Sequence, residues 1–159
     1  MREIFIAEPP AIHLARSPLV VDARVLAACV FGEAERDAAE IRLRGFDLHA
    51  PWLIDYELAN IAVSKLRRNE LTLELAVRVL AEFSAMALER HAPLPEDVAT
   101  IARHYRLTAY DAAYLWVAGA IAAPLATFDK KLSIAASDYL GKLPAASPGP
   151  AVGDRPADH

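Results

Sequence analysis

The sequence predicts an α/β fold, a three-layer α/β/α sandwich around a short parallel β-sheet. Short apolar runs typical of buried parallel strands alternate along the chain with segments of helical periodicity. Of the 159 residues, 55% are hydrophobic, which excludes a wholly disordered chain and suffices for one domain with a buried core. We therefore expect a single ordered domain, and we place it over residues 18–144.

The two ends of the chain differ from this domain in composition. Residues 1–17 contain the run Ile4-Phe5-Ile6 and then the pair Pro9-Pro10, so they form either an N-terminal extension or an extra strand. Residues 145–159 are rich in Pro, Ala, Gly and Asp without periodicity, and we expect a disordered tail there.

The expected elements begin and end where the sequence changes character. Gly45 suits the end of a helix, Pro51 the first turn of the next helix and Thr72 an N-cap. Strands are expected over residues 19–22, 46–50, 86–89, 124–128 and 140–143. Helices are expected over residues 23–31, 33–44, 51–68, from 72 onward, 95–105, from 108 to just before 124, and 130–137. The helix after Thr72 carries a stripe that most simply faces the core: Leu73, Ala76, Val77, Leu80 and Phe83.

Charge and cysteine content exclude several classes of protein. The net charge of −4 argues against generic nucleic-acid binding, so any RNA contact must come from local basic patches or a partner. The single cysteine, Cys29, excludes a disulfide within the chain, and its apolar neighbours predict a buried thiol. The chain starts without a signal-peptide pattern, and its longest uncharged stretch, residues 112–128, is too short for a membrane span. We therefore expect a cytoplasmic protein without membrane contact.

Asp111 is the one acid within a strongly apolar helical pattern. Residues three and four apart share a helix face, so Asp111 shares its face with Leu107, Thr108, Tyr114 and Leu115. A carboxylate on an apolar face is costly unless something binds it. Two interpretations are open. Asp111 completes a near-match to a capping box that begins at Thr108, or it is a metal ligand.

Three further acids favour the second interpretation. Asp22 and Asp129 each end an expected strand, and sites in parallel sheets lie outside the carboxyl ends of the strands. Helix capping alone would also account for both of these residues. It does not account for Glu57, whose helical neighbours are apolar except for Asn60.

Four carboxylates on one rim would repel each other and raise each other's pKa values. A hard divalent cation resolves this, because Mg²⁺ takes oxygen ligands and usually binds through one or two carboxylates, water and a substrate phosphate. Such a site activates water and stabilises charge on a phosphodiester.

The residues around these acids form four motifs: Val20-Val21-Asp22, Glu57-Leu58-Ala59-Asn60, Tyr110-Asp111-Ala112-Ala113-Tyr114 and Thr127-Phe128-Asp129-Lys130-Lys131-Leu132. In their order and spacing they resemble those of PIN-domain nucleases, and more narrowly of the VapC-type toxins of toxin–antitoxin pairs. The resemblance covers roughly residues 19–143. It implies an endoribonuclease that depends on Mg²⁺ or Mn²⁺, cleaves RNA, forms a homodimer and is inhibited by a cognate antitoxin.

The resemblance also implies roles for single residues. The acidic catalytic pocket would consist of four carboxylates: Asp22, Glu57, Asp111 and Asp129. Asp22 and Asp111 would be the most direct metal ligands, and Asp129 would hold a second metal ion or a water ligand of the first. Glu57 would position or deprotonate the attacking water. Thr127 and Asn60 would support these groups by hydrogen bonds.

Basic residues near the motifs could bind RNA phosphates. Arg24 departs from the family pattern, because a small hydroxyl or amide residue often follows the first acid, whereas Ala23 and Arg24 follow Asp22 here. Arg24 could bind the substrate phosphate, pair with an acid and weaken metal binding, or point into solvent. Further cations lie near the second and fourth motifs, where a solvated helix end is the usual interpretation: Lys65, Arg68 and Lys130.

One alternative function stays open. A catalytically weak PIN-like domain could act as an RNA- or protein-binding module, with Arg24 neutralising the pocket. A domain that had lost its catalytic activity would tend to lack one of the four acids, and all four are present. With either function, part of the stripe after Thr72, together with Met86, could contact a second copy or an antitoxin.

Overall fold

The computed structural model describes residues 16–144, so the expected C-terminal tail and all but the last two residues of the expected N-terminal extension or extra strand lie outside the described residues. The centre of the fold is a sheet of four parallel strands in the order β3-β2-β1-β4. The strands are β1 (Ser17–Val21), β2 (Phe46–Pro51), β3 (Leu88–His91) and β4 (Leu125–Ala126). The predicted short parallel sheet is confirmed.

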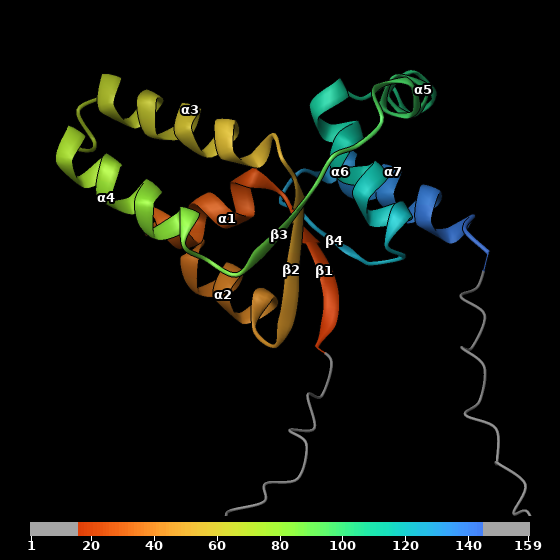
Figure 1. The fold of residues 1–159 in the computed structure, drawn as a ribbon, viewed down its shortest axis with the longest axis horizontal. Helices are drawn as coiled ribbons and strands as arrows, with labels where there is room; N and C mark the ends of the chain where they lie inside the picture. The colour runs from red at the N-terminus through yellow and green to blue at the C-terminus, as the bar shows by residue number, and fades with distance from the viewer. Residues whose placement is uncertain (1–15, 145–159) are drawn as a thin grey trace, which may run out of the picture.

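Helices cover both faces of this sheet, which confirms the three-layer arrangement (Figure 1). One layer holds α1 (Ala23–Val30), α2 (Arg36–Leu43), α3 (Ile54–Arg67) and α4 (Leu73–Ser84). The other layer holds α5 (Pro95–Tyr105), α6 (Ala109–Ala120) and α7 (Lys130–Gly141). The predicted start of α5 at Pro95 and the predicted N-caps Thr72 and Thr108 agree with the structure.

The order of the strands places a reversal of the chain beside β1. From β1 the chain steps outward to β2 and then to β3, and it next returns to the opposite side of β1 to form β4. In open α/β sheets the crevice outside the carboxyl ends of the strands at such a switch point is the usual position of a site. In this fold, Asp22 directly follows β1 and Asp129 lies three residues after β4.

Two apolar clusters hold the layers to the sheet. The larger cluster joins β1, α1 and α3 to one face of α6, and includes Val20, Leu26 and Leu58, all fully buried. The smaller cluster lies among α5, α6 and α7 around Leu115. Helix α6 contributes to both clusters, so the helix that carries Asp111 is anchored on two sides. Cys29 packs at the margin of the larger cluster, where partial burial raises the pKa of its thiol.

Two of the expected elements were placed wrongly. Pro51 does not begin a helix but ends β2, because the pairing with β3 continues through Pro51 opposite His91 and the amide of Trp52 donates to the His91 carbonyl at 2.9 Å. The strand expected over residues 140–143 does not form. Helix α7 continues to Gly141 instead, since Leu140 continues its apolar face and packs against both clusters.

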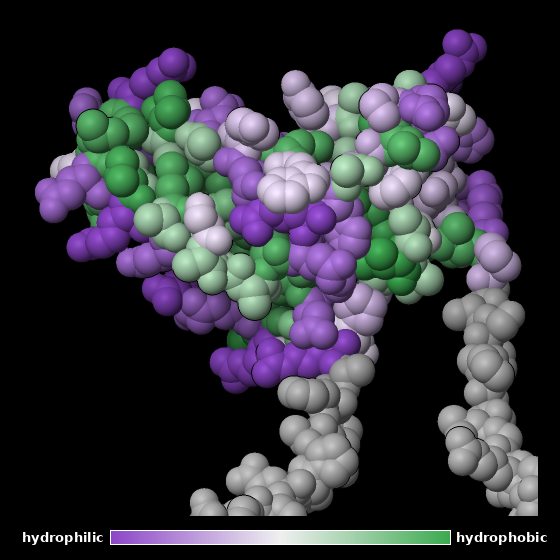
Figure 2. Space-filling model, viewed as in Figure 1, coloured by the Kyte–Doolittle hydropathy of each residue, from purple (hydrophilic) through white to green (hydrophobic). Residues whose placement is uncertain are grey.

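The expectation that the whole stripe of α4 faces the core was also wrong. Ala76 and Phe83 are buried, but Leu73 and Val77 are 68% and 59% exposed. Helix α4 packs on α3, and the α3–α4 hairpin extends beyond the sheet (Figure 1). Hydrophobic side chains therefore gather at the surface over this hairpin (Figure 2). Within residues 16–144, no helix combines the length and the hydrophobicity that a membrane span requires.

Replacing Leu115 by Ala should lower the free energy of unfolding by about 2–5 kcal/mol, because this fully buried side chain leaves a cavity between α5, α6 and α7. The matched control is Leu73→Ala on α4, where the loss should stay within about 0.5 kcal/mol. Denaturant unfolding of both variants measures the difference. Equal losses would contradict the division between buried and exposed leucines described above.

Candidate functional site

Asp22 and Asp129 are held at the carboxyl edge of the sheet by the helices that they begin. Asp22 is the N-cap of α1, and its Oδ1 accepts a hydrogen bond from the Val25 amide at 2.9 Å. Asp129 is the N-cap of α7, and its Oδ1 accepts from the Leu132 amide at 2.9 Å. Capping therefore uses one carboxylate oxygen of each residue, while it fixes the direction of the other.

Asp111 is fixed by Thr108, the N-cap of α6, through one half of a capping box and a bond between the two side chains. The Asp111 amide donates to Thr108 Oγ1 at 3.1 Å, and the Thr108 hydroxyl donates to Asp111 Oδ2 at 2.7 Å. One hydroxyl thus caps α6 and orients the acid in its first turn. The two interpretations of Asp111, as part of a cap and as part of a site, are compatible in this geometry.

Glu57 is fixed across the fold rather than along its own helix. Its side chain lies partly buried on α3, and Glu57 Oε2 accepts a hydrogen bond of 2.5 Å from the Tyr114 hydroxyl on α6. Burial and the charge of Glu57 raise the pKa of Tyr114, so the phenol stays protonated and remains a donor. Tyr114 was not predicted as a site residue, although it shares the helix face of Asp111.

All four predicted acids line one hollow of about 240 Å³ at the switch point of the sheet. The residues that line it are Asp22, Ala23, Arg24, Glu57, Thr108, Tyr110, Asp111, Tyr114, Asp129 and Leu132. The four acids come from four separate segments of the chain. The fold thus brings together side chains that are up to about a hundred residues apart in the sequence.

The two residues predicted to support the acids have different positions. Thr127 lies between Asp22 and Asp129: its Oγ1 accepts from the Asp129 amide at 2.9 Å, and its hydroxyl hydrogen-bonds the carboxylate of Asp22. Asn60 is exposed one turn after Glu57, and it lines a neighbouring hollow with Tyr56 and Tyr110. The structure thus brings Thr127, but not Asn60, to the wall between the acids.

The electrostatics of the hollow favour protonated acids or a bound cation. Burial raises the pKa of Asp22, which is only 6% exposed, and hydrogen bonds from Thr127 and Val25 offset part of that rise. Burial also raises the pKa of Glu57; the Tyr114 hydrogen bond opposes this, and the negative charges of Asp111 and Asp22 add to it. A positive charge in the hollow would relieve both effects.

The donor set fits a hard divalent cation. Every acid here offers carboxylate oxygen, the ligand type of Mg²⁺ and Mn²⁺, and no histidine or cysteine lines the hollow. No three of the four bring their oxygen atoms within 4.8 Å of one another. That spacing suits an ion that binds directly to one or two carboxylates and keeps several water ligands.

The predicted substrate-binding cations are not all near the hollow. Arg24 is exposed and lines it, and none of the ion pairs among residues 16–144 includes Arg24. Lys130 is exposed at the start of α7, next to Asp129. Lys65 instead pairs with Glu33 at 2.7 Å, and Arg68 pairs with Glu70 at 2.6 Å. The structure does not bring these last two side chains to the acids.

Exposed aromatic rings next to the acids were missed by the sequence reasoning. Tyr56, beside Glu57, is 79% exposed, and Tyr110, beside Asp111, is 66% exposed. Both line the neighbouring hollow of Glu57 and Asn60. A signal was available in the sequence, because a tyrosine directly precedes each of these two acids.

A four-stranded parallel sheet with an acidic hollow at its switch point places the protein in a class of α/β domains with a carboxylate-lined site. Residues 19–137 match the family model described as PIN domain, and the chain belongs to this family. It is 33% identical over 120 residues to Ribonuclease VapC3 from Pyrobaculum aerophilum, which covers 72% of this chain and 92% of that protein. The crystal structure of PAE2754 from Pyrobaculum aerophilum superposes with a TM-score of 0.60 at 25% identity, covering 79% of this chain and 85% of that one.

Replacing Asp22 by Asn should stabilise the metal-free protein at neutral pH. The pKa values of Asp22 and Glu57 are higher in the folded protein than their ordinary values of 3.8 and 4.5, so the folded protein binds these protons more tightly than the unfolded chain does. The contribution of the two groups to folding stability is therefore fully present below the ordinary pKa values and is lost as the pH rises through the raised ones. Asn keeps the cap but carries no charge. We expect a gain on the order of 1 kcal/mol at pH 7 that vanishes near pH 4.

Thermal unfolding in the presence of a chelator, followed across this pH range, measures the gain. Asp47→Asn, which changes an exposed acid on β2, is the control and should show little change. A loss of stability in Asp22→Asn at pH 7 would show that the charge of Asp22 does not destabilise the metal-free protein.

Proposed function

We propose that the protein is an Mg²⁺- or Mn²⁺-dependent endoribonuclease of the VapC toxin type. The observation that carries the proposal is the convergence of Asp22, Glu57, Asp111 and Asp129 on one hollow at the switch point of the sheet. The name of the relative Ribonuclease VapC3 supports RNA as the substrate. Membership of the PIN domain family supports the reaction class.

Under this proposal each acid takes a role that its surroundings support. A bound divalent cation supplies activation of water and stabilisation of charge on the phosphodiester. Asp22, Asp111 and Asp129 would hold it through the oxygens that their caps leave available. Glu57 would accept the proton of the attacking water on Oε1, since Oε2 is held by Tyr114. Its raised pKa brings it closer to neutral pH, where a general base works best.

Arg24 and the exposed tyrosines would hold the RNA. Arg24 lines the acidic hollow without an ion pair among the described residues, so its guanidinium is available for a substrate phosphate. Tyr56 and Tyr110 offer exposed ring faces beside the acids, and unpaired bases stack on such rings. This arrangement favours single-stranded RNA over a duplex, whose bases are not available for stacking.

The partners belong to the same proposal. A cognate antitoxin would inhibit the enzyme in the cytoplasm, and two copies of the chain would form a homodimer. The exposed apolar side chains of α4, Leu73 and Val77, offer a surface for a protein contact of either kind.

Replacing Asp111 by Asn should lower the rate of RNA cleavage at least about a hundredfold, because a charged ligand is lost from the hollow. Asn can still accept the hydrogen bond of Thr108, so the cap of α6 is kept. The measurement is cleavage of total RNA in Mg²⁺ or Mn²⁺, with a chelator blank. Asp37→Asn, which makes the same charge change in the first turn of α2, should cleave as the wild type does.

Equal cleavage by wild type and Asp111→Asn would contradict the assignment of Asp111 to a metal site. Cleavage that persists in chelator would point to a contaminating nuclease. A wild type that binds RNA but does not cleave it in either metal would leave the RNA-binding module as the better description of this domain.

Replacing Tyr56 by Ala should raise KM for a single-stranded RNA oligonucleotide by about 5- to 100-fold, since base–aromatic stacking contributes about 1–3 kcal/mol. The value of kcat should change little, because Tyr56 does not line the hollow that the four acids share. Tyr56→Phe keeps the ring face and is expected to behave as the wild type. Loss of activity in the Phe variant as well would assign the effect to the hydroxyl and not to stacking.

A further inference from the structure

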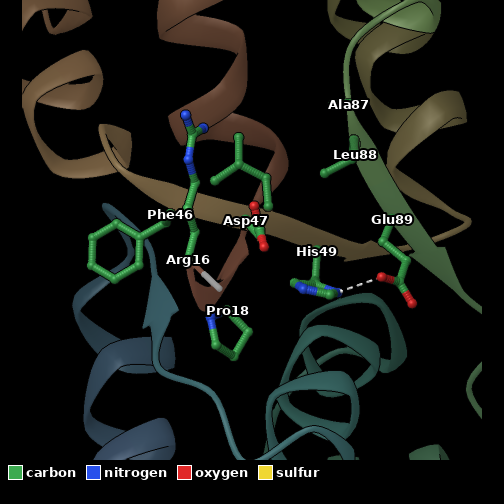
Figure 3. A pocket seen from close by; sticks show the side chains of 9 residues that line it. Arg16, Pro18, Phe46, Asp47, His49, Ala87, Leu88 and Glu89 are labelled. Carbon is green, nitrogen blue, oxygen red and sulfur yellow. Dashed lines mark ion pairs between the residues drawn. The ribbon is translucent and has the colours of Figure 1, made fainter. Parts of the chain in front are cut away.

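A second group of metal-ligand side chains lies away from the acidic hollow, on neighbouring strands of the sheet. His49 on β2 is the register partner of Glu89 on β3, and His91 follows Glu89 by two residues on the same face. Figure 3 shows His49 and Glu89 facing each other across the two strands. Neither of them, nor His91, lines the hollow of the four acids.

The ligand atoms of the three side chains lie close together, and the two histidines are nearest to different oxygens of the Glu89 carboxylate. His49 Nδ1 lies 3.0 Å from His91 Nε2 and 3.6 Å from Glu89 Oε2, and His91 Nε2 lies 3.9 Å from Glu89 Oε1. Ligand atoms around a tetrahedral Zn²⁺, at about 2.0–2.1 Å from the ion, are about 3.3 Å apart. The observed distances lie on both sides of that value. Among residues 16–144, this is the one trio of such groups whose ligand atoms all lie within 4.8 Å.

The backbone holds this arrangement in place. Both strands are paired through these positions, so the Cα atoms of the three residues are held by the ladder. The histidine side chains are only 12% and 18% exposed, whereas that of Glu89 is 67% exposed and free to adjust. A hollow of about 580 Å³, lined by His49 and Glu89, opens beside them, so an ion from solvent can reach the trio (Figure 3).

We propose that His49, Glu89 and His91 bind a divalent transition-metal ion of the Zn²⁺ class. Two imidazole nitrogens and one carboxylate are ligands that Zn²⁺ prefers, whereas Mg²⁺ prefers oxygen alone. The alternative is a hydrogen bond in which one ring N–H donates to the other ring nitrogen. Binding requires both nitrogens to present lone pairs, so the donor ring changes its tautomer and the ion takes the place of the proton between the rings.

This site is distinct in kind from the acidic hollow. It is built on two strands and would tie β3, an outer strand of four residues, to β2. Three protein ligands leave one position of a tetrahedral ion for water or for a group from a partner. The bound ion would therefore stabilise the sheet independently of catalysis.

The test is Zn²⁺ binding to the full chain without an affinity tag, after removal of metals by a chelator. In a buffer with an excess of Mg²⁺, which occupies the acidic hollow, isothermal titration calorimetry of the wild type should show one equivalent of bound Zn²⁺, and Zn²⁺ should raise Tm. His91→Gln should weaken binding at least about tenfold and abolish the rise in Tm. Glu89→Gln, at an exposed side chain whose change cannot disturb packing, should also weaken binding.

Two controls separate this site from others. His104→Gln removes an exposed histidine on α5, and Asp111→Asn alters the acidic hollow; both should bind Zn²⁺ as the wild type does. The proposal is overturned if the wild type binds no Zn²⁺, or if His91→Gln and Glu89→Gln both keep wild-type affinity. It is equally overturned if Asp111→Asn alone abolishes binding, because the ion would then occupy the acidic hollow.

Discussion

The pairing of β1 with β4 is the contact on which the geometry of the acidic hollow depends. The Val20 amide donates to the Pro124 carbonyl at 2.9 Å, and the Asp22 amide donates to the Ala126 carbonyl at 3.1 Å. These bonds join β4 to the free side of β1, where the chain returns after six intervening helices and two strands. They set the backbone of Asp22 beside the segment that carries Thr127 and Asp129. Because β1 and β4 are neighbours, Asp22 and Asp129, which follow these two strands, line the same hollow.

Helix capping and function use the same side chains in this fold. Asp22, Thr108 and Asp129 satisfy amides that helix starts leave without partners, and the same bonds aim the acids. The capping hydrogen bonds at these three helix starts therefore offset part of the repulsion between the carboxylates. The rest of that cost shows in the raised pKa values of Asp22 and Glu57. Such a site is preorganised, because local bonds hold three of its acids and the Tyr114 hydroxyl holds Glu57 before any ion or substrate arrives.

Sequence patterns predicted the parts of the structure that local chemistry determines. The caps at Thr72 and Thr108 and the helix from Pro95 follow from residues within a few positions of each other. The acids at strand ends could be predicted together because parallel strands share a carboxyl edge. The hydrogen bond from Tyr114 to Glu57 joins residues 57 positions apart, and α2 and β2 lie between the two residues of the Lys65–Glu33 ion pair. Neither contact could be predicted from local spacing. The end of β2 at Pro51 and the full length of α7 depended likewise on tertiary partners.

The sheet order has a consequence for how copies of this chain can meet. A parallel sheet exposes two outer strands, and an outer strand with free amides and carbonyls is a template for strand addition and aggregation. Here β3 carries Glu89, Arg90 and His91 and is followed closely by Pro93, while β4 has two residues and is preceded by Pro124. Charge, proline and shortness all oppose the growth of the sheet at these edges in the described part of the chain. Contacts with other chains are therefore directed to the helical surfaces.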